Sequence, residues 1–355
     1  MKKVFKFLLI LLLVIIVAVG GLLGWLTATE YSPDPVETLA PVQKEAEKAL
    51  SEQAELKILS WNIGYAGLGK ESDFFMDGGE HVNAADETAV RRYLSGIAST
   101  VQSGGYDLVM LQEVDTSSSR TFRIDEAASL AVGDAYHALN YSCPFVPNPN
   151  TLIIEPLGRI NSGLLTMSEF EIERSERQAL PCPFSWPLRI ANLKRCLLVS
   201  YLPIEGSEKQ LVLVNLHLEA YDSGEGKIAQ TKQLQDFIRS EYEKGNYVIA
   251  GGDFNQVFPG SLEVYPNKHP DLWTVGALEE SSLPGEGWQY AFDTAVPTCR
   301  LLNQPYDPGD RENTQYYVID GFILSPNVEL ISVNSLDMGF ENSDHNPVSI
   351  CVRLK

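Results

Sequence analysis

Short apolar runs bounded by glycine, proline or polar residues recur along most of the chain. Runs of this length with such boundaries are typical of buried β-strands. We expect strands at residues 57–62, 107–111, 163–167, 196–201, 211–216, 247–250, 316–324 and 347–354. The pattern therefore predicts a domain built largely from β-sheet.

Apolar residues recur at helical spacing in two places between these runs. Asp86 would cap the first helix, and Gly104-Gly105 would end it. Its apolar face is Val90, Leu94, Ile97 and Val101, and that of the second helix is Leu234, Phe237, Ile238 and Tyr242. A shorter helix is expected near residues 126–132, whereas residues 259–315 give no clear pattern. Interspersed strands and helices without a short repeat predict one domain of two packed sheets with helices outside.

The amino terminus predicts a membrane anchor. Lys2, Lys3 and Lys6 precede an unbroken apolar run from Phe7 to Leu26, and about 20 apolar residues suffice to cross a bilayer as a helix. A cleaved signal peptide would have a shorter apolar core and small residues at the cut, so we favour an uncleaved anchor. The lysines before the span place the amino terminus in the cytoplasm and the remainder outside.

Three segments are expected: a cytoplasmic tip and transmembrane anchor at residues 1–27, a tether at 28–55 and a catalytic domain at 56–355. Prolines interrupt the first half of the tether, and residues 44–50 could form a short helix. No core-building periodicity is present in the tether. We therefore expect a form that begins near Glu52 to fold and to stay active.

Composition narrows the function without identifying it. The 355 residues are 44% hydrophobic and carry a net charge of -20. Such a charge argues against a protein held to nucleic acid mainly by a basic surface. It does not exclude catalysis on a phosphate, because a bound metal supplies positive charge locally.

The cysteines predict neither a disulfide scaffold nor a zinc finger. Their number is five, and no CxxC is present. Cys182 and Cys196 could pair in an oxidising compartment, but buried or free thiols are the favoured interpretation.

The clearest chemical signal follows the apolar run at residues 247–250. Gly251 and Gly252 would let the backbone turn tightly. Asp253 and Asn255 would then share one face, with Phe254 turned into the core. A carboxylate beside an amide suits an oxygen-rich site for a hard cation and a phosphate.

Other apolar runs end in, or are broken by, residues useful in phosphate chemistry. Each of these residues alone has an ordinary explanation, such as a solvated strand end, a turn residue or a half-buried histidine. Their repetition argues for a common site formed by Asn62, Glu113, His217, Asp253 with Asn255, Asp320, and Asp344 with His345.

These residues resemble the endonuclease/exonuclease/phosphatase superfamily, which includes DNase I-like nucleases, neutral sphingomyelinases and inositol polyphosphate 5-phosphatases. The resemblance covers roughly residues 56–355. It implies an α/β fold, a four-layer αββα sandwich of two mixed sheets with the active site at one end. The matching segments, in the family's order, are residues 60–62, 111–113, 215–218, 252–255, 319–320 and 343–345.

The resemblance also implies a metal site. Glu113 would be the main Mg²⁺ ligand, while Asn62 and Asp344 would complete the metal environment, partly through water. Mn²⁺ is an alternative cation. Zinc is less favoured, because the set lacks thiolates and a histidine cluster.

The remaining motif residues would act on the phosphate. His345 would be the general base or would orient the attacking water, with Asp320 holding its ring. Asp253 would position the water, Asn255 would bind a phosphate oxygen, and His217 would donate a hydrogen bond to the phosphate. An Asp-backed histidine keeps a fixed tautomer and a basic ring.

One departure from the family concerns the partner of His217. DNase-like members place a carboxylate before the third strand to hold the corresponding histidine, whereas this chain has Asn161 in that region. Asn161 could serve instead. The presence of His217 itself argues against the abasic-site endonuclease branch.

The sequence thus predicts a membrane-anchored, metal-dependent phosphoesterase that acts outside the cytoplasm. Its substrate could be a phospholipid head group, nucleic acid or a small molecule, and either a diester or a monoester. The alternatives are a nuclease acting on extracellular DNA or RNA, and an inactive binding module. The inactive module is disfavoured because no catalytic motif residue is lost. No protein partner is evident.

The loop after the first strand offers one further hint about the substrate. It carries Phe74-Phe75-Met76 without a strand or helix pattern around them. The favoured interpretation is that these side chains fill the loop's own packing. The alternative is an apolar lip that contacts a lipid-like or aromatic part of the substrate.

Overall fold

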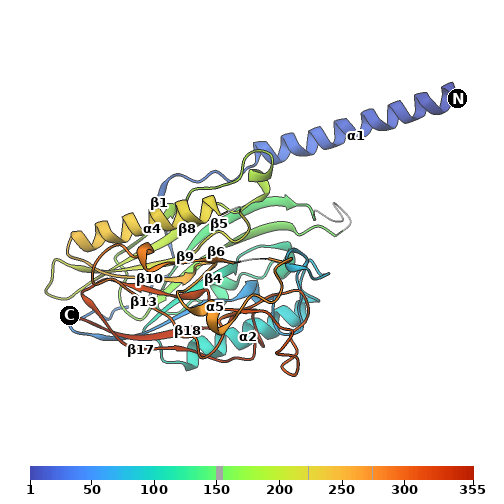
Figure 1. Cartoon of the computed structure of the whole chain (residues 1–355). Coiled ribbons are helices and arrows are strands. Elements are labelled where there is room, and N and C mark those ends of the chain that lie inside the picture. Colours follow the sequence, from blue (N-terminus) through green and yellow to red (C-terminus); the bar gives the residue numbers. More distant parts are fainter. Residues whose placement is uncertain (149–154, 223, 274) are drawn as a thin grey trace.

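The computed structural model describes residues 1–148, 155–222, 224–273 and 275–355. Two seven-stranded mixed sheets form its centre (Figure 1). The first sheet has, in spatial order, β17 (Val328–Ser335), β18 (Val348–Leu354), β3 (Glu55–Asn62), β4 (Leu108–Asp115), β6 (Gly158–Ser168), β5 (Asp134–Val146) and β2 (Pro41–Gln43). The second has β1 (Val36–Thr38), β7 (Arg174–Ala179), β8 (Cys196–Pro203), β9 (Gln210–His217), β10 (Tyr247–Asp253), β16 (Asp320–Leu324) and β13 (Gln289–Ala291).

Smaller elements connect and cover the sheets. Two short ladders pair β11 (Gln256–Val257) with β12 (Gly276–Ala277), and β14 (Cys299–Arg300) with β15 (Tyr316–Tyr317). The α-helices are α1 (Lys2–Ala28), α2 (Glu87–Ser103), α3 (Glu126–Leu130), α4 (Glu225–Glu243) and α5 (Ser261–Val264). Five 3₁₀ turns complete the described elements: Gly64–Ala66, Phe75–Asp77, Ser119–Thr121, Leu188–Ala191 and Glu280–Ser282.

Three apolar clusters define four layers. The central cluster lies between the sheets. Successive side chains along a strand point to opposite faces, so every second residue of each sheet faces this space. A second cluster packs α2 and α3 on the outer face of the first sheet. A third packs α4 on the outer face of the second sheet. The prediction of an αββα sandwich is confirmed.

The segment expected to be a tether is instead partly built into both sheets. Strand β1 pairs with β7, and β2 pairs with β5. Leu50 is 1% exposed and belongs to the core between the sheets. The helix considered for residues 44–50 is not formed. Lys44 Nζ instead makes a salt bridge with Asp134 Oδ2 at 2.7 Å. The tether prediction was wrong here, because short edge strands need few apolar residues and leave no periodic signal.

This correction changes the expected effect of truncation. We expect a form that begins at Glu52 to melt about 5 °C or more below a form that begins at Thr29, since it loses Leu50 and two edge strands. Scanning calorimetry of the two forms measures the difference, and the longer form controls for removal of α1. Equal melting temperatures would show that residues 29–51 are a tether after all.

Helix α1 projects away from the rest of the molecule (Figure 1). Among the described residues it is the one helix long and apolar enough to cross a membrane, and the span that qualifies is 0% buried. A signal sequence shares these properties of length and composition. An apolar surface of this size is not stable in water, so α1 needs a membrane or another apolar environment.

Candidate active site

The predicted catalytic residues lie at neighbouring strand ends. Asp253, the last residue of β10, is directly opposite His217 of β9 and Asp320 of β16. In the facing sheet, Asn62 ends β3 opposite Gln112 of β4. The Asn62 amide nitrogen lies 3.0 Å from Asp253 Oδ2, so the two sheets meet at this point.

The two glycines before Asp253 do not form the expected turn, because they belong to strand β10. A Cβ on Gly251 would lie 2.3 Å from the ring of Phe322. A Cβ on Gly252, whose φ is +146°, would lie 1.9 Å from the carbonyl oxygen of Leu216. Glycine is therefore required here for close approach of neighbouring strands. Phe254 is fully buried, as predicted.

Glu113 is presented to the site by a distortion of its strand. The register between β4 and β6 shifts after Leu111, and Glu113 has a φ of +55°. Such a conformation is strained for a residue with a Cβ and is concentrated at functional sites. The bulge turns the carboxylate toward Asn62, whose amide nitrogen lies 3.3 Å from Glu113 Oε1.

Asn62 holds the two carboxylates close together. Its amide nitrogen faces both Glu113 and Asp253, while its amide oxygen accepts a hydrogen bond from the Gly64 N–H at 3.0 Å. The amide oxygen keeps a second lone pair, which a metal or a metal-bound water could use. The amide nitrogen positions the two carboxylates.

Asp320 and His345 form a tight buried pair, in which Asp320 Oδ2 lies 2.8 Å from His345 Nδ1. Burial by itself would lower the pKa of His345, but the neighbouring Asp320, Cys299 and Asp344 raise that pKa well above its usual value. The acidic neighbours thus favour the imidazolium, and a bound cation would offset their charge and favour the neutral ring that can accept a proton.

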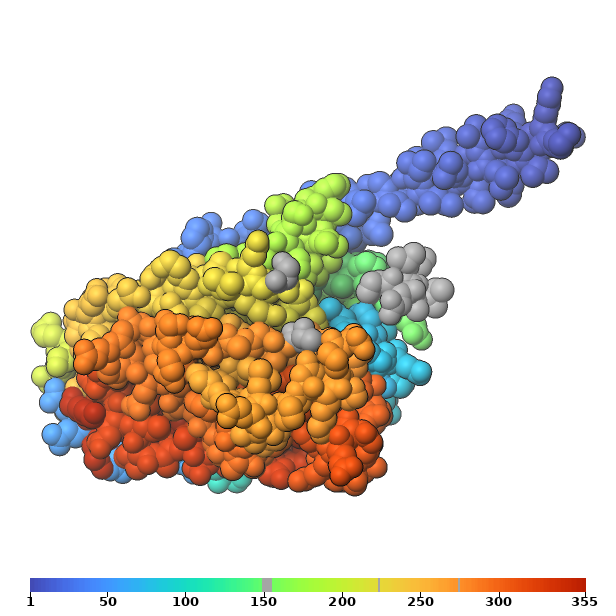
Figure 2. Space-filling view, viewed as in Figure 1, coloured from blue at the N-terminus to red at the C-terminus, as the bar shows by residue number. Residues whose placement is uncertain are grey.

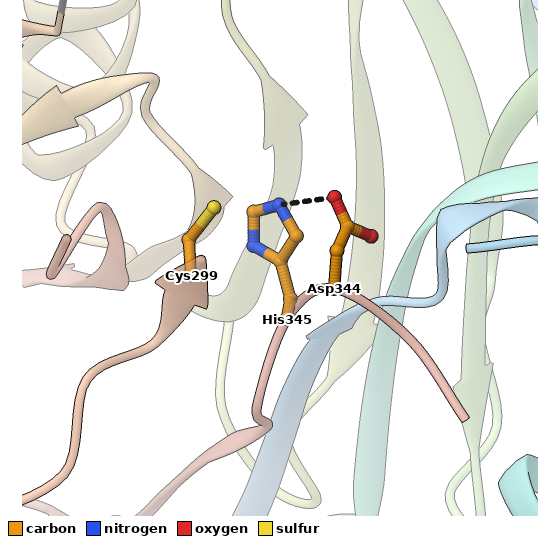
Figure 3. Close-up of side chains that lie close together, drawn as sticks. All are labelled: Cys299, Asp344 and His345. Atoms are coloured by element: carbon orange, nitrogen blue, oxygen red, sulfur yellow. Dashed lines mark ion pairs between the residues drawn. The ribbon is translucent and has the colours of Figure 1, made fainter. Parts of the chain in front are cut away.

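The other ring nitrogen of His345 faces the remaining acidic groups. Nε2 is 3.8 Å from Asp253 Oδ2 and 3.9 Å from Asp344 Oδ2. Figure 3 shows the ring between the carboxylate of Asp344 and the thiol of Cys299. The segment that carries Asp344 and His345 is fixed to β3. Trp61 Nε1 donates to the His345 carbonyl, and the Ser343 hydroxyl donates to the Asn62 carbonyl.

Two carboxyl groups resist ionisation. Burial and the charge of Asp320 raise the pKa of Asp253 to about 6. Burial and the charge of Glu113 raise the pKa of Asp344 to about 7. A divalent cation would offset the repulsion in this cluster and favour the ionised forms. The carboxylate oxygens here fit a hard cation. Asp253, Asp320 and His345 could each offer a ligand atom, all within 4.8 Å of one another.

Cys299 is a neighbour that sequence reasoning missed. Its thiol, Asp344 and His345 could each offer a ligand atom, all within 4.8 Å of one another. A thiol therefore does lie at this site, although the sequence motifs used to disfavour zinc contain none. Burial raises the pKa of Cys299 to about 12. The protonated thiol is a poor ligand, which leaves the oxygen ligands dominant.

Cation affinity should rise with pH. Asp344 is largely protonated below its raised pKa of about 7, and a cation binds the deprotonated form. Affinity should therefore increase about tenfold between about pH 6 and pH 8, with proton release on binding. Calorimetry with Mg²⁺ and Mn²⁺ in buffers of different ionisation enthalpy measures both quantities. Asp344→Asn should weaken binding and flatten the pH dependence; a pH-independent affinity of the unaltered protein would contradict the assignment.

His217 lies in the cluster but lacks the predicted partner. Its Nε2 is 3.4 Å from Asp253 Oδ2, while its buried Nδ1 has no hydrogen-bond partner among the residues that the structure describes. Asn161 instead contacts Ser142 in the neighbouring strand β5. The suggestion that Asn161 holds His217 was wrong. Burial and the charge of Arg195 lower the pKa of His217 well below its usual value, which keeps the ring neutral.

Asn255 is held by the backbone. Its φ is +49°, its N–H donates to Asp253 Oδ1 at 2.8 Å, and its amide nitrogen donates to the Leu218 carbonyl at 2.8 Å. The second amide hydrogen remains available to a phosphate oxygen, because a side-chain amide carries two.

The catalytic cluster opens into a pocket of about 490 Å³. The pocket wall includes residues that the sequence motifs did not identify. Arg120 lies 3.4 Å above the ring of Tyr65 and makes a two-point ion pair with Asp115. Asp77 accepts a hydrogen bond from the Tyr221 hydroxyl at 3.1 Å. No local sequence signal marks these contacts, because their members lie far apart along the chain or in irregular loops.

Comparison with known proteins places this geometry in a family. The sequence profile described as the endonuclease/exonuclease/phosphatase family matches residues 59–345. No curated protein sequence matches the chain.

Several solved structures share the fold. An endonuclease/exonuclease/phosphatase from Beutenbergia cavernae is 18% identical, with a TM-score of 0.56 over 84% of this chain and 72% of that chain. A family protein from Bacteroides thetaiotaomicron is 14% identical, with a TM-score of 0.51 over 86% and 99%. ANGEL2, a 2′,3′-cyclic phosphatase, is 15% identical, with a TM-score of 0.52 over 85% and 96%. At such low identity these neighbours establish the fold alone.

Proposed function

From the premise that this chain belongs to the endonuclease/exonuclease/phosphatase family, whose members are metal-dependent phosphoester hydrolases, we propose a magnesium-dependent enzyme acting outside the cytoplasm. The observation that carries the proposal is the convergence of three acidic residues and one histidine on a single pocket: Glu113, Asp253, Asp344 and His345. Asp320 lies behind them and pairs with the His345 ring. The lysines before α1 support an outward-facing catalytic domain.

The proposed residue roles follow from the contacts. Glu113 and Asp344 would hold the cation, and Asn62 would keep Glu113 beside Asp253. The bound cation would neutralise charge on the phosphate oxygens. Asp253 would orient the attacking water, and His345 would accept its proton, with Asp320 stabilising the resulting imidazolium.

Hydrolysis adds one water to one phosphate ester. The water oxygen forms a new bond to phosphorus, the bond from phosphorus to the leaving oxygen breaks, and the leaving oxygen takes up a proton. Neutral His217 and the free amide hydrogen of Asn255 would donate hydrogen bonds to the phosphate as charge builds up on it.

Hydrolysis of bis-p-nitrophenyl phosphate tests this function. The full chain in detergent should release p-nitrophenol with Mg²⁺ or Mn²⁺ and should lose this activity with a chelator. If neither this diester, nor p-nitrophenyl phosphate, nor any other phosphate ester tested is hydrolysed at any metal concentration, the result would contradict the proposal and favour an inactive module on the same scaffold.

A further inference from the structure

We propose that the substrate is a membrane phospholipid. Its phosphate would enter the acidic end of the pocket, while its apolar part would lie against the wall that adjoins the end of α1. This inference rests on the proposed function and narrows its substrate to one class.

The pocket has two chemically different ends. Glu113, Asp253 and Asp344 line one part of it, together with His217 and His345. Apolar side chains line much of the remainder, among them Phe75, Met76, Val146, Leu157, Ile160 and Leu188. A pocket of about 490 Å³ has room for more than a phosphate group, and its apolar wall fits the hydrocarbon part of an amphiphile.

The apolar wall is continuous with the membrane helix. Leu26 in the last turn of α1 is 5% exposed and packs in one cluster with Val146, Leu157 and Ile160. Those three residues also line the pocket. The apolar cluster at the end of α1 therefore shares side chains with the pocket wall.

A second contact fixes the domain against the end of α1. Trp186 Nε1 lies 3.2 Å from the Thr27 hydroxyl oxygen, and Arg189 makes a two-point ion pair with Glu30. Figure 2 shows the yellow-green segment around residues 181–195 at the base of the helix. The orientation of the pocket relative to α1 is thus held by packing and by ion pairs.

The same segment presents apolar side chains to the surroundings. Trp186 is 54% exposed and Leu188 is 64% exposed, and Leu188 also lines the pocket. Tryptophan is enriched at the interface between a bilayer and water, where its ring lies at the level of the head groups. We call Trp186 and Leu188 the rim of the pocket. When α1 spans a bilayer, this rim lies next to the membrane surface, and a lipid can reach the pocket along an apolar path.

The Phe74–Met76 loop contributes to both packing and the pocket wall. Phe74 is 9% exposed and packs with Tyr65, Leu68 and Leu302. Phe75 contacts this cluster and also the cluster at the end of α1. Met76 is 45% exposed at the pocket. The loop therefore links the catalytic end of the pocket to its apolar end.

The first test measures the contribution of lipid chains with the full-length protein. Phosphatidylcholine vesicles with phosphatidylglycerol and phosphatidic acid offer diesters and a monoester, and phosphorus NMR identifies the products. For the lipid that is hydrolysed, the dihexanoyl form should have a kcat/KM at least about tenfold above that of the chain-free glycerol phosphate ester. Equal values, or a preference for adenosine 2′,3′-cyclic phosphate, would overturn the inference.

The second test alters the rim. Leu188→Ser and Trp186→Ser should each lower the ratio of vesicle-lipid turnover to bis-p-nitrophenyl phosphate turnover at least about fivefold. Leu262→Ser is the matched control, because Leu262 is 43% exposed and does not line the pocket. An unchanged ratio in both rim variants would refute the lipid path.

The two proposals fail in different ways. If only the lipid inference is wrong, the protein hydrolyses bis-p-nitrophenyl phosphate but does not hydrolyse vesicle lipid. Failure of the proposed function gives no hydrolysis of any phosphate ester.

Discussion

Replacing Glu113 by glutamine is expected to lower kcat/KM about 1,000-fold and to weaken Mg²⁺ binding at least about 100-fold. Glutamine keeps the length of the side chain but removes the charge that a divalent cation needs. Glu113 is held at the site by a strand bulge with a φ of +55° and by the Asn62 amide. The substitution therefore tests the charge with little change of shape.

The measurements are steady-state hydrolysis of bis-p-nitrophenyl phosphate and calorimetric titration with Mg²⁺. Glu243→Gln is the matched control, because Glu243 is exposed at the end of α4. It should leave both quantities unchanged. If Glu113→Gln also leaves both unchanged, Glu113 is not a metal ligand and the proposed site is wrong.

The second large effect concerns Asp320 and His345 as a unit. Each alanine substitution is expected to lower kcat about 100-fold to 10,000-fold, and the double substitution should cost little more than either one. The reason is the 2.8 Å contact between Asp320 Oδ2 and His345 Nδ1. Once either partner is absent, the remaining one cannot stabilise the proton taken from water.

A matched Asp–His pair outside the site provides the control. His81 Nδ1 lies 2.9 Å from Asp73 Oδ1, and the His81 side chain is 70% exposed. His81→Ala should retain nearly full kcat on the soluble diester. If the losses from Asp320→Ala and His345→Ala instead multiply in the double variant, the two residues act independently and the water is activated by another group.

Much of the fold and the catalytic set was predictable from local pattern. Apolar runs fixed most of the central strands, and helical spacing fixed α2 and α4, because a side chain that faces the core must be apolar whatever its partner is. Asp253 follows such a run, Asp320 interrupts one, and His345 precedes the last one. Their positions at strand ends were therefore visible without knowledge of how the sheets pack.

Only the tertiary structure decided how the remaining parts combine. Edge strands β1 and β2 are short and mostly exposed, so nothing periodic distinguished them from a tether. Cys299 is next to His345, although the two are far apart in sequence and belong to no shared motif. The glycines before Asp253 let neighbouring strands approach closely. Glycine is needed there because Phe322 and Leu216 in those strands leave no room for a Cβ.

The anchor and the pocket wall also separate what the sequence determined from what the tertiary structure decided. The sequence by itself determined that residues 7–26 are apolar enough to span a membrane and that a set of phosphate-handling residues follows. Only tertiary packing placed Leu26 against Val146 and Ile160 and so joined the pocket wall to the end of α1. A local pattern records whether each residue prefers water or a core, whereas the identity of its neighbours is set when distant segments pack together.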